Sequence, residues 1–304
     1  MSSPWSASAP AKPAATPENP RHTLPKPTKP ASPDEESPLT QPAIFVSHGA
    51  PTLPLDDVAA RTFLSGLGTR IDAAHGRPSA ILVASAHWET ARPEISAPLA
   101  NATIHDFQGF PRALYDIRYP APPAPDIAAA SISLLTTAGI RAAIDLERGL
   151  DHGAWVPLML MYPDADIPVS QLSVQTHLGP EHHWRVGQAL AMMREQGVLI
   201  LGSGAFTHNL MELRSPRPTE EPDWVADFAA WTDAALRDGR TDDLLAYRRL
   251  APHGARNHPT EEHLLPLFVA MGAGGGKATH LHKSVTHGVL RMDVYGFAAE
   301  IRAS

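Results

Sequence analysis

The stretch AIFVSHG at residues 43–49 indicates the class of fold to which this chain belongs. Its first four residues are apolar, and a short continuous apolar run is typical of a strand that is buried on both faces. Such strands belong to sheets that helices cover on both sides. The run stops at a serine, a histidine and a glycine. Because ligands of open α/β sheets bind beyond the carboxyl ends of the strands, His48 is a candidate site residue.

The same pattern occurs twice more along the chain. The stretch AILVASAHW at residues 80–88 contains an apolar run followed by His87, and VLILGSG at residues 198–204 is followed by His208. Neighbouring strands of this kind bring their carboxyl ends to one edge of a sheet. We therefore expect His48, His87 and His208 to lie together. Neutral imidazole is both a common metal ligand and the side chain that titrates closest to neutral pH.

Helical patterns alternate with the strand candidates, which also include residues 167–174 and 289–295. Apolar spacing, capping residues and terminating glycines predict helices at 126–138, 182–196, 224–239, 241–247 and, capped by Thr260, from 260 onward. Alternation of strands and helices predicts an α/β fold, here a single domain with three α/β/α layers around a central, mostly parallel or mixed sheet.

The first 42 of the 304 residues differ in composition from the rest. They are rich in proline and alanine and hold scarcely any large apolar residue, so they cannot bury enough surface to offset the entropy of ordering. We expect residues 1–42 to be a disordered extension and residues 43–304 to be the folded domain. The extension has no apolar core of a secretory signal, and no run approaches the about 20 apolar residues that span a bilayer. The expected location is the cytoplasm.

Removing residues 1 to about 40 should leave the thermal midpoint and the turnover of the protein nearly unchanged, because this segment lacks apolar anchors. Thermal unfolding and activity of the truncated and full-length chains check this. A large loss of either property would mean that the segment packs on the domain.

Composition excludes several classes of function. The net charge of −7 gives no general attraction to nucleic acid or to an anionic membrane surface, so the expected partner is a small molecule. The chain has no cysteine, which excludes disulfides, thiolate metal sites and cysteine nucleophiles, and any metal must be held by nitrogen and oxygen. The glycine spacings of phosphate-binding and dinucleotide-binding loops are missing, as is that of a nucleophile elbow.

Two further segments contribute candidate site residues. The stretch LDHGAWVP at residues 150–157 places His152 in a loop ahead of a predicted helix. The stretch NHPTEEH at residues 257–263 holds two imidazoles and two carboxylates at a predicted helix start. It is either a solvated, well-capped terminus or a segment in which Glu262 or His263 points inward. Two histidines and one further ligand on one face leave open positions, which a metal needs to bind both a substrate and dioxygen.

With these segments in order, the sequence resembles a known family, the 4,5-DOPA extradiol dioxygenase type of class III ring-cleavage dioxygenases. The resemblance extends in order from about residue 44 to residue 297. The stretches that carry it are FVSHGAP (45–51), ASAHWET (84–90), DFQGFP (106–111), GLDHGAWVPL (149–158), GSG (202–204) with HNL (208–210), and NHPT (257–260) with PL (266–267).

The resemblance implies a non-haem metal at the edge of the sheet, usually Fe(II), with Zn(II) an alternative at the same site. His48 and His87 match the first two metal ligands of the superfamily. The last ligand is glutamate in the protocatechuate-cleaving relatives, whereas this branch carries a Glu-His pair, here Glu262 and His263. We choose His263 as the third ligand and keep Glu262 and His258 as alternatives.

The same resemblance implies two further roles. His208 matches the histidine that acts as acid and base beside the metal, although some members count it among the ligands. His152 matches a histidine that contacts a substrate oxygen. The implied reaction inserts both atoms of dioxygen into a catechol-type ring next to its hydroxyls, with a DOPA-like or other substituted catechol as substrate.

Two other functions are compatible with the same residues. A zinc-dependent hydrolase also uses a histidine-lined open site, to activate water. A non-catalytic metal-binding scaffold protein uses the same superfamily fold. Oxygen uptake with a catechol after Fe(II) loading separates the dioxygenase from the hydrolase, and failure to hold metal favours the scaffold.

Overall fold

The computed structural model describes residues 40–213 and 220–301. The expected disordered extension therefore lies outside the described residues, except for its last three positions. Of these, Gln41 is buried, and its side-chain amide donates hydrogen bonds to the carbonyls of His75 at 2.9 Å and Gly76 at 3.0 Å. Packing onto the domain thus begins no later than Gln41, two residues before the predicted start.

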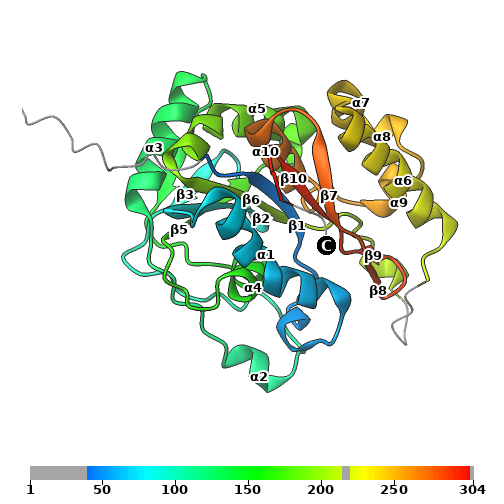
Figure 1. The fold of residues 1–304 in the computed structure, drawn as a ribbon, viewed down its shortest axis with the longest axis horizontal. Coiled ribbons are helices and arrows are strands. Elements are labelled where there is room, and N and C mark those ends of the chain that lie inside the picture. Colours follow the sequence, from blue (N-terminus) through cyan, green and yellow to red (C-terminus); the bar gives the residue numbers. More distant parts are fainter. Residues whose placement is uncertain (1–39, 214–219, 302–304) are drawn as a thin grey trace, which may run out of the picture. The chain divides into compact units, whose positions relative to one another are not determined.

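The main sheet of the described residues has eight strands in the order β4-β3-β5-β2-β6-β1-β10-β7 (Figure 1). Its strands are β1 (Ala43–Ser47), β2 (Ala80–Glu89), β3 (Glu94–Ser96), β4 (Ala143–Asp145), β5 (Val169–Val174), β6 (Val198–Gly204), β7 (Ala278–His282) and β10 (Val294–Phe297). The central pairs β1/β6, β6/β2 and β2/β5 are parallel. The pairs β1/β10, β10/β7 and β3/β5 are antiparallel, so the sheet is mixed.

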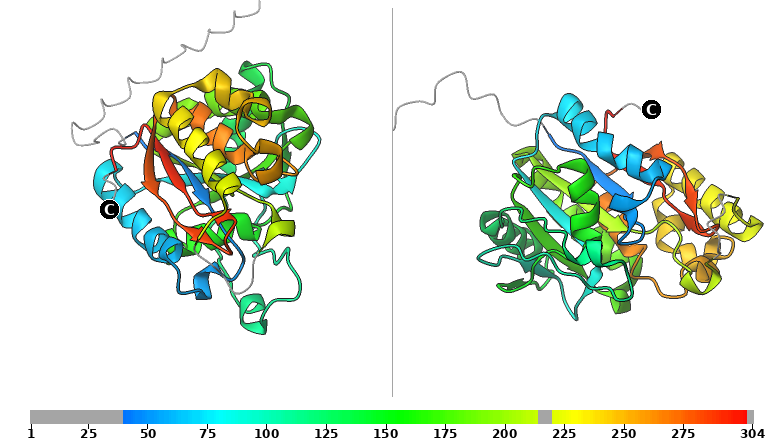
Figure 2. Two further views of the ribbon diagram at one scale, coloured as in Figure 1. Left: turned by 90° about the vertical axis from the view of Figure 1, so that its right-hand side faces the viewer. Right: turned by 90° about the horizontal axis from the view of Figure 1, so that it is seen from below.

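Side chains of the central strands alternate between two apolar layers. Phe45 packs with the helices α3 (Pro125–Thr137), α5 (Gly179–Leu190) and α10 (Leu265–Gly274). Ile44 and Val46 point the other way and pack with α1 (Ala59–His75) and α4 (His152–Met161). In the left view of Figure 2, α1 in blue and α10 in orange lie on opposite sides of the sheet. The predicted three-layer α/β fold with a mixed sheet is confirmed.

The remaining elements extend this sandwich. They are α2 (Arg112–Tyr115), α6 (Asp223–Asp238), α7 (Thr241–Leu245), α8 (Tyr247–Leu250), α9 (Gly254–Asn257), short 3-10 helices η1 to η4 at 53–55, 176–178, 191–196 and 210–212, and a two-stranded sheet of β8 (Val285–Thr286) and β9 (Leu290–Arg291). Helices α6 to α9 follow one another beside the sheet edge, where α6 packs against β7 (Figure 1). Within the described residues, every helix is too short or too polar to cross a lipid bilayer.

Three predicted elements are wrong in detail. The strand expected at 289–295 is divided into β9 and β10, because the amide of Met292 bonds to Ser284 outside the main sheet. The helix expected at 182–196 starts earlier, at Gly179, and changes to 3-10 geometry from Ala191 onward. The helix expected at 241–247 ends at Leu245, and a new turn, α8, begins at Tyr247.

Candidate metal centre and substrate pocket

A cavity of about 560 Å³ brings together the five histidines that the sequence singled out. They come from segments far apart in the chain, and the list is His48, His87, His152, His208 and His263. The cavity lies at the carboxyl ends of β1, β2 and β6, where ligands of open α/β sheets bind.

Two of these histidines stand on different elements from those expected. His87 lies within β2, which continues to Glu89, rather than beyond the end of the strand. The early part of β2 pairs with β6 through Ser85, and the strand then runs on past its partner. His152 is the first residue of α4 rather than a loop residue, because the side chain of Asp151 caps that helix by accepting from the amide of Ala154. His48, as predicted, directly follows its strand.

His263 lies in a turn before α10, so the predicted helix cap at Thr260 is wrong. The helix begins only at Leu265, where Pro266 occupies its first turn and needs no hydrogen-bond acceptor for a backbone N–H. The hydroxyl of Thr260 donates to the carboxylate of Glu262 at 3.0 Å instead of capping the backbone. The direction of His263 is therefore set by the turn and its neighbours, not by a first helical turn.

Close contact with the end of β6 holds this turn in place. The amide of Ala205 donates to the carbonyl of His263 at 2.8 Å. A methyl group at Gly204 would overlap that same carbonyl oxygen, and one at Gly202 would overlap the carbonyl oxygen of Pro266. The glycines of the GSG stretch are thus explained by backbone contact with the segment that carries His263.

The substitution Gly204→Ala should therefore weaken both folding and metal binding. The added methyl group must push the backbone of His263 away, and overpacking of this kind costs about 1–3 kcal/mol of unfolding free energy. Denaturant unfolding and a metal titration of the variant measure the two effects. A methyl group at Gly66 in α1 would meet open space, so Gly66→Ala is the matched control. Gly139 is equally open, but its positive φ of 76° would strain an alanine. Unchanged metal affinity in Gly204→Ala would contradict this account.

The Nε2 atoms of three histidines converge in the cavity. Nε2 of His87 lies 3.0 Å from Nε2 of His48 and 3.3 Å from Nε2 of His263. Nitrogens that bind a tetrahedral metal at about 2.0–2.1 Å stand about 3.3 Å apart. Both distances therefore fit pairs of nitrogen ligands on one metal ion, with His87 between the other two.

The opposite nitrogen of each of these rings has its own partner. Nδ1 of His48 lies 3.1 Å from the hydroxyl of Ser203, which itself donates to the carbonyl of Gly153 and so accepts from the ring. Nδ1 of His87 lies 3.4 Å from Oδ2 of Asp106.

The third ring is anchored in the same way, since Nδ1 of His263 lies 2.9 Å from Oε1 of Glu262. Ser203 and Glu262 accept hydrogen bonds, so Nδ1 of His48 and of His263 carries the hydrogen, and the charge of Asp106 favours the same form of His87. Each Nε2 then presents a lone pair to the centre. Three lone pairs at this spacing repel one another, and a cation between them removes the repulsion.

Burial keeps these imidazoles uncharged. It lowers the pKa of His48 and of His263 well below the ordinary value, and the surrounding imidazoles lower both further. Burial is also the largest cause that lowers the pKa of His87 to about 4. All three rings are thus in the neutral form that binds metal at neutral pH.

His208 and His152 line the same cavity in different ways. The ring of His208 stacks on that of His263 with centroids 3.4 Å apart, and burial lowers its pKa to about 4. Neither ring nitrogen of His208 makes a hydrogen bond to the part of the chain that the structure describes. Nδ1 of His152 lies 2.9 Å from Oδ1 of Asp106. His208 is therefore free to exchange a proton, whereas His152 is held in one orientation.

The two alternative ligands occupy other positions. Glu262 faces His263, and it forms with His208 and His263 one of two groups of potential ligand atoms within 4.8 Å of one another among the described residues. The other group consists of His48, His87 and His152. His258 belongs to neither group. Its Nε2 bonds to the carbonyl of Phe206 at 3.0 Å, and its ring is buried against Phe228.

Most of the other side chains of the cavity wall are apolar, and the sequence patterns assigned a role to none of them. They are Pro51, Phe107, Phe110, Pro111, Leu210, Leu213, Leu290 and Met292. Thr52, Thr207, His287 and Arg291 line the wall as well. Asp106 and Ser203 were missed as well, although both lie in stretches that carried the family resemblance. Their roles depend on which imidazole each one meets, and no spacing rule gives that.

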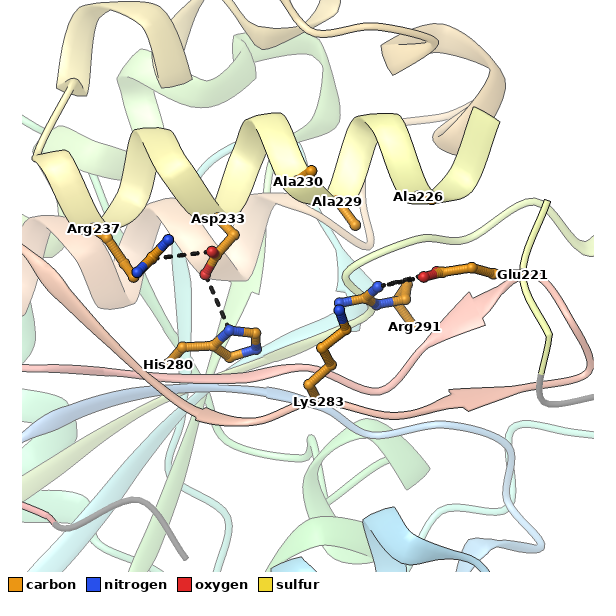
Figure 3. A pocket seen from close by; sticks show the side chains of 9 residues that line it. All are labelled: Glu221, Ala226, Ala229, Ala230, Asp233, Arg237, His280, Lys283 and Arg291. Carbon is orange, nitrogen blue, oxygen red and sulfur yellow. Dashed lines mark hydrogen bonds and ion pairs between the residues drawn. The ribbon is translucent and has the colours of Figure 1, made fainter. Parts of the chain in front are cut away.

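A second cavity, of about 550 Å³, lies between α6 and β7 (Figure 3). Its charged groups are largely paired with one another: Arg291 with Glu221 at 2.9 Å, and Asp233 with both Arg237 and His280 at 3.0 Å. Neither group of potential metal ligands found in the described residues lies here. The histidine-lined cavity is therefore the candidate metal centre.

Comparison with known proteins agrees with this site. Residues 42–297 match the family model described as the catalytic LigB subunit of aromatic ring-opening dioxygenase. The chain is 44% identical to a 4,5-DOPA dioxygenase extradiol from Beta vulgaris, over 84% of this chain and 96% of the relative. It is 38% identical to a protein of the same description from Escherichia coli K12, over 78% of this chain and 86% of the relative.

A solved structure is similar as well. The crystal structure of an uncharacterized protein from Escherichia coli K12 matches with a TM-score of 0.70 and 32% identity, covering 84% of this chain and 99% of that one. Neither the hydrolase nor the scaffold alternative gains support from these comparisons. Enzymes of the matched family depend on a metal, and the three convergent imidazoles fit one. The chain therefore belongs to the LigB family of aromatic ring-opening dioxygenases and is a non-haem extradiol ring-cleaving dioxygenase.

Proposed function

We propose that this enzyme cleaves a substituted catechol with Fe(II) held by His48, His87 and His263. The observation that carries the proposal is the convergence of three Nε2 lone pairs whose opposite ring nitrogens are each anchored. Three ligands on one face leave positions open for substrate and dioxygen, as in non-haem Fe(II) oxygenases. Zn(II) fits the same nitrogens but supplies no redox chemistry.

Bound Fe(II) supplies a common centre for both reactants and a path for electrons from the ring to dioxygen. His208 accepts a proton from a catechol hydroxyl, since its ring is uncharged at neutral pH and unbonded among the described residues. It returns that proton to oxygen later in the reaction. His152 donates its Nδ1 hydrogen to Asp106, so its Nε2 accepts a hydrogen bond from the second hydroxyl.

The substrate is a dihydroxyphenyl compound with a side chain. Relatives are described as acting on 4,5-DOPA or on 2,3-dihydroxyphenylpropionate. A cavity of about 560 Å³ is of the size that holds drug-sized ligands, about 300–1,000 Å³, and exceeds the needs of a bare ring. Its apolar walls, Phe107 and Phe110 among them, exclude water from the reacting atoms.

Oxygen consumption by the metal-loaded protein tests this function. Metal-free protein is loaded anaerobically with Fe(II) or with Zn(II), and each form is mixed with aerated DOPA, dihydroxyphenylpropionate and unsubstituted catechol. The Fe(II) form should consume one dioxygen per substrate and give a product with the mass of substrate plus dioxygen. Turnover by the Zn(II) form without oxygen uptake would instead mean a hydrolase, and failure to hold either metal would mean a scaffold.

A further inference from the structure

We propose that Asp106 is a positioning residue that orients two imidazoles at once: His87 as a metal ligand and His152 as a hydrogen-bond acceptor for substrate. This inference rests on the proposed function, in which these two histidines have those roles. It concerns one carboxylate with two different partners, and neither partner can be recognised from the sequence around Asp106.

The two oxygens of Asp106 divide their contacts between the two histidines. Oδ1 accepts from the backbone amide of His152 at 3.0 Å and from its Nδ1 at 2.9 Å. Oδ2 lies 3.4 Å from Nδ1 of His87. The centroids of the two imidazole rings are 3.8 Å apart, so a single side chain between their outer edges can hold both.

These contacts favour one placement of the hydrogens on both rings. Nδ1 of His152 donates to Oδ1, so it carries hydrogen and its Nε2 presents a lone pair to the cavity. The negative charge of Oδ2 repels a lone pair on the nearby Nδ1 of His87, so it favours hydrogen on that atom and a lone pair on Nε2. The backbone amide of His152 is in the first turn of α4, where it has no partner within the helix. Asp106 therefore satisfies this amide too, which ties the loop that carries the carboxylate to the start of the helix.

Asp151, the other carboxylate that acts on His87, is not free to replace Asp106. Asp151 is fully buried, but its Oδ1 accepts from Ser85 at 2.7 Å, and its Oδ2 accepts from Arg148 at 2.7 Å and from Gln171. Its oxygens are occupied by other donors. Loss of Asp106 is therefore not compensated from this side.

The substitution Asp106→Asn separates the two functions of the carboxylate. The backbone N–H of His152 faces Oδ1, so the amide oxygen of Asn must take that side. The amide NH₂ must then face Nδ1 of His87, where two donors meet. This repulsion between two donors is removed when the hydrogen of His87 moves from Nδ1 to Nε2. The hydrogen on Nε2 then points at the metal position. His152 keeps its acceptor and its orientation.

The substitution Asp106→Ala has the opposite balance. Nδ1 of His87 can donate to water and keep its Nε2 lone pair for the metal. His152 loses its only side-chain hydrogen bond in the described residues, so its ring is no longer fixed in one tautomer and one orientation. We expect Asp106→Asn to weaken metal binding about 10–100-fold, and more than Asp106→Ala does. At saturating Fe(II), kcat should fall further in Asp106→Ala than in Asp106→Asn.

Nitrogen NMR of metal-free protein labelled at histidine tests the same idea without turnover. The wild type should show His87 and His152 with hydrogen on Nδ1. In Asp106→Asn, His87 alone should change to the Nε2–H form. The exposed Asp116, which like Asp106 precedes α4 in the chain, provides a matched control. Asp116→Asn removes an equal charge and should change neither ring.

Two results would overturn the proposal. One is an unchanged tautomer of His87 in Asp106→Asn. The other is that a single variant shows both the larger loss of metal affinity and the larger loss of kcat. Thermal unfolding shows whether each variant folds, and Asp106→Ser replaces the alanine variant if that one does not. A wild type that shows the expected tautomers and binds metal, but does not consume oxygen with any catechol, would refute the proposed function and not the positioning of the rings.

Discussion

Replacing His87 with alanine should remove stoichiometric metal binding and reduce ring cleavage to background, while the fold persists. His87 stands between the other two proposed ligands, with its Nε2 3.0 Å from that of His48 and 3.3 Å from that of His263. Without His87, only the Nε2 atoms of His48 and His263 remain of the three proposed ligands, and the nitrogen between them is missing. Metal analysis after loading with Fe(II) or Zn(II), circular dichroism and oxygen uptake measure the three properties.

The control for this variant is His177→Ala, which removes an exposed imidazole outside the cavity. It should bind metal and turn over like the wild type. His48→Ala should behave like His87→Ala, since His48 is equally a proposed ligand. Full metal occupancy in His87→Ala would show that the three convergent nitrogens are not the metal site.

The second large effect separates His263 from His208. His263→Ala should lose the metal, because its Nε2 belongs to the convergent set and its Nδ1 is fixed by Glu262. His208→Ala should keep the metal and bind catechol but turn over more slowly by a factor of about 10² to 10⁴, the usual size of a general acid–base contribution. The stacked ring of His208 and its unbonded nitrogens among the described residues suit proton transfer.

Metal analysis and single-turnover rates on both variants test this division of roles. The conservative variant His208→Gln keeps a hydrogen-bonding group without a base, and it should be as slow as His208→Ala. Metal loss in His208→Ala with retention in His263→Ala would reverse the two roles. Metal loss in both variants would mean a site with four histidine ligands.

Local patterns were enough to identify the layers of the fold. Apolar runs such as 43–46 and 198–201 are buried on both faces, and burial of a strand depends mainly on its own side chains. Boundaries were less predictable where partners decide them. β2 continues past His87 because neighbouring strands set its end. α10 begins only at Leu265, where a proline occupies the first turn.

The sequence by itself therefore determined the α/β class and five of the six histidines that line the cavity, all but His287. Only the tertiary structure decided which nitrogen of each ring faces the centre. Those choices depend on partners that are distant in the chain: His87 meets His48 across 39 positions and His263 across 176. Asp106 likewise meets His152 across 46 positions. A hydrogen bond fixes a tautomer only where donor and acceptor come within reach, and for these pairs folding alone brings them there.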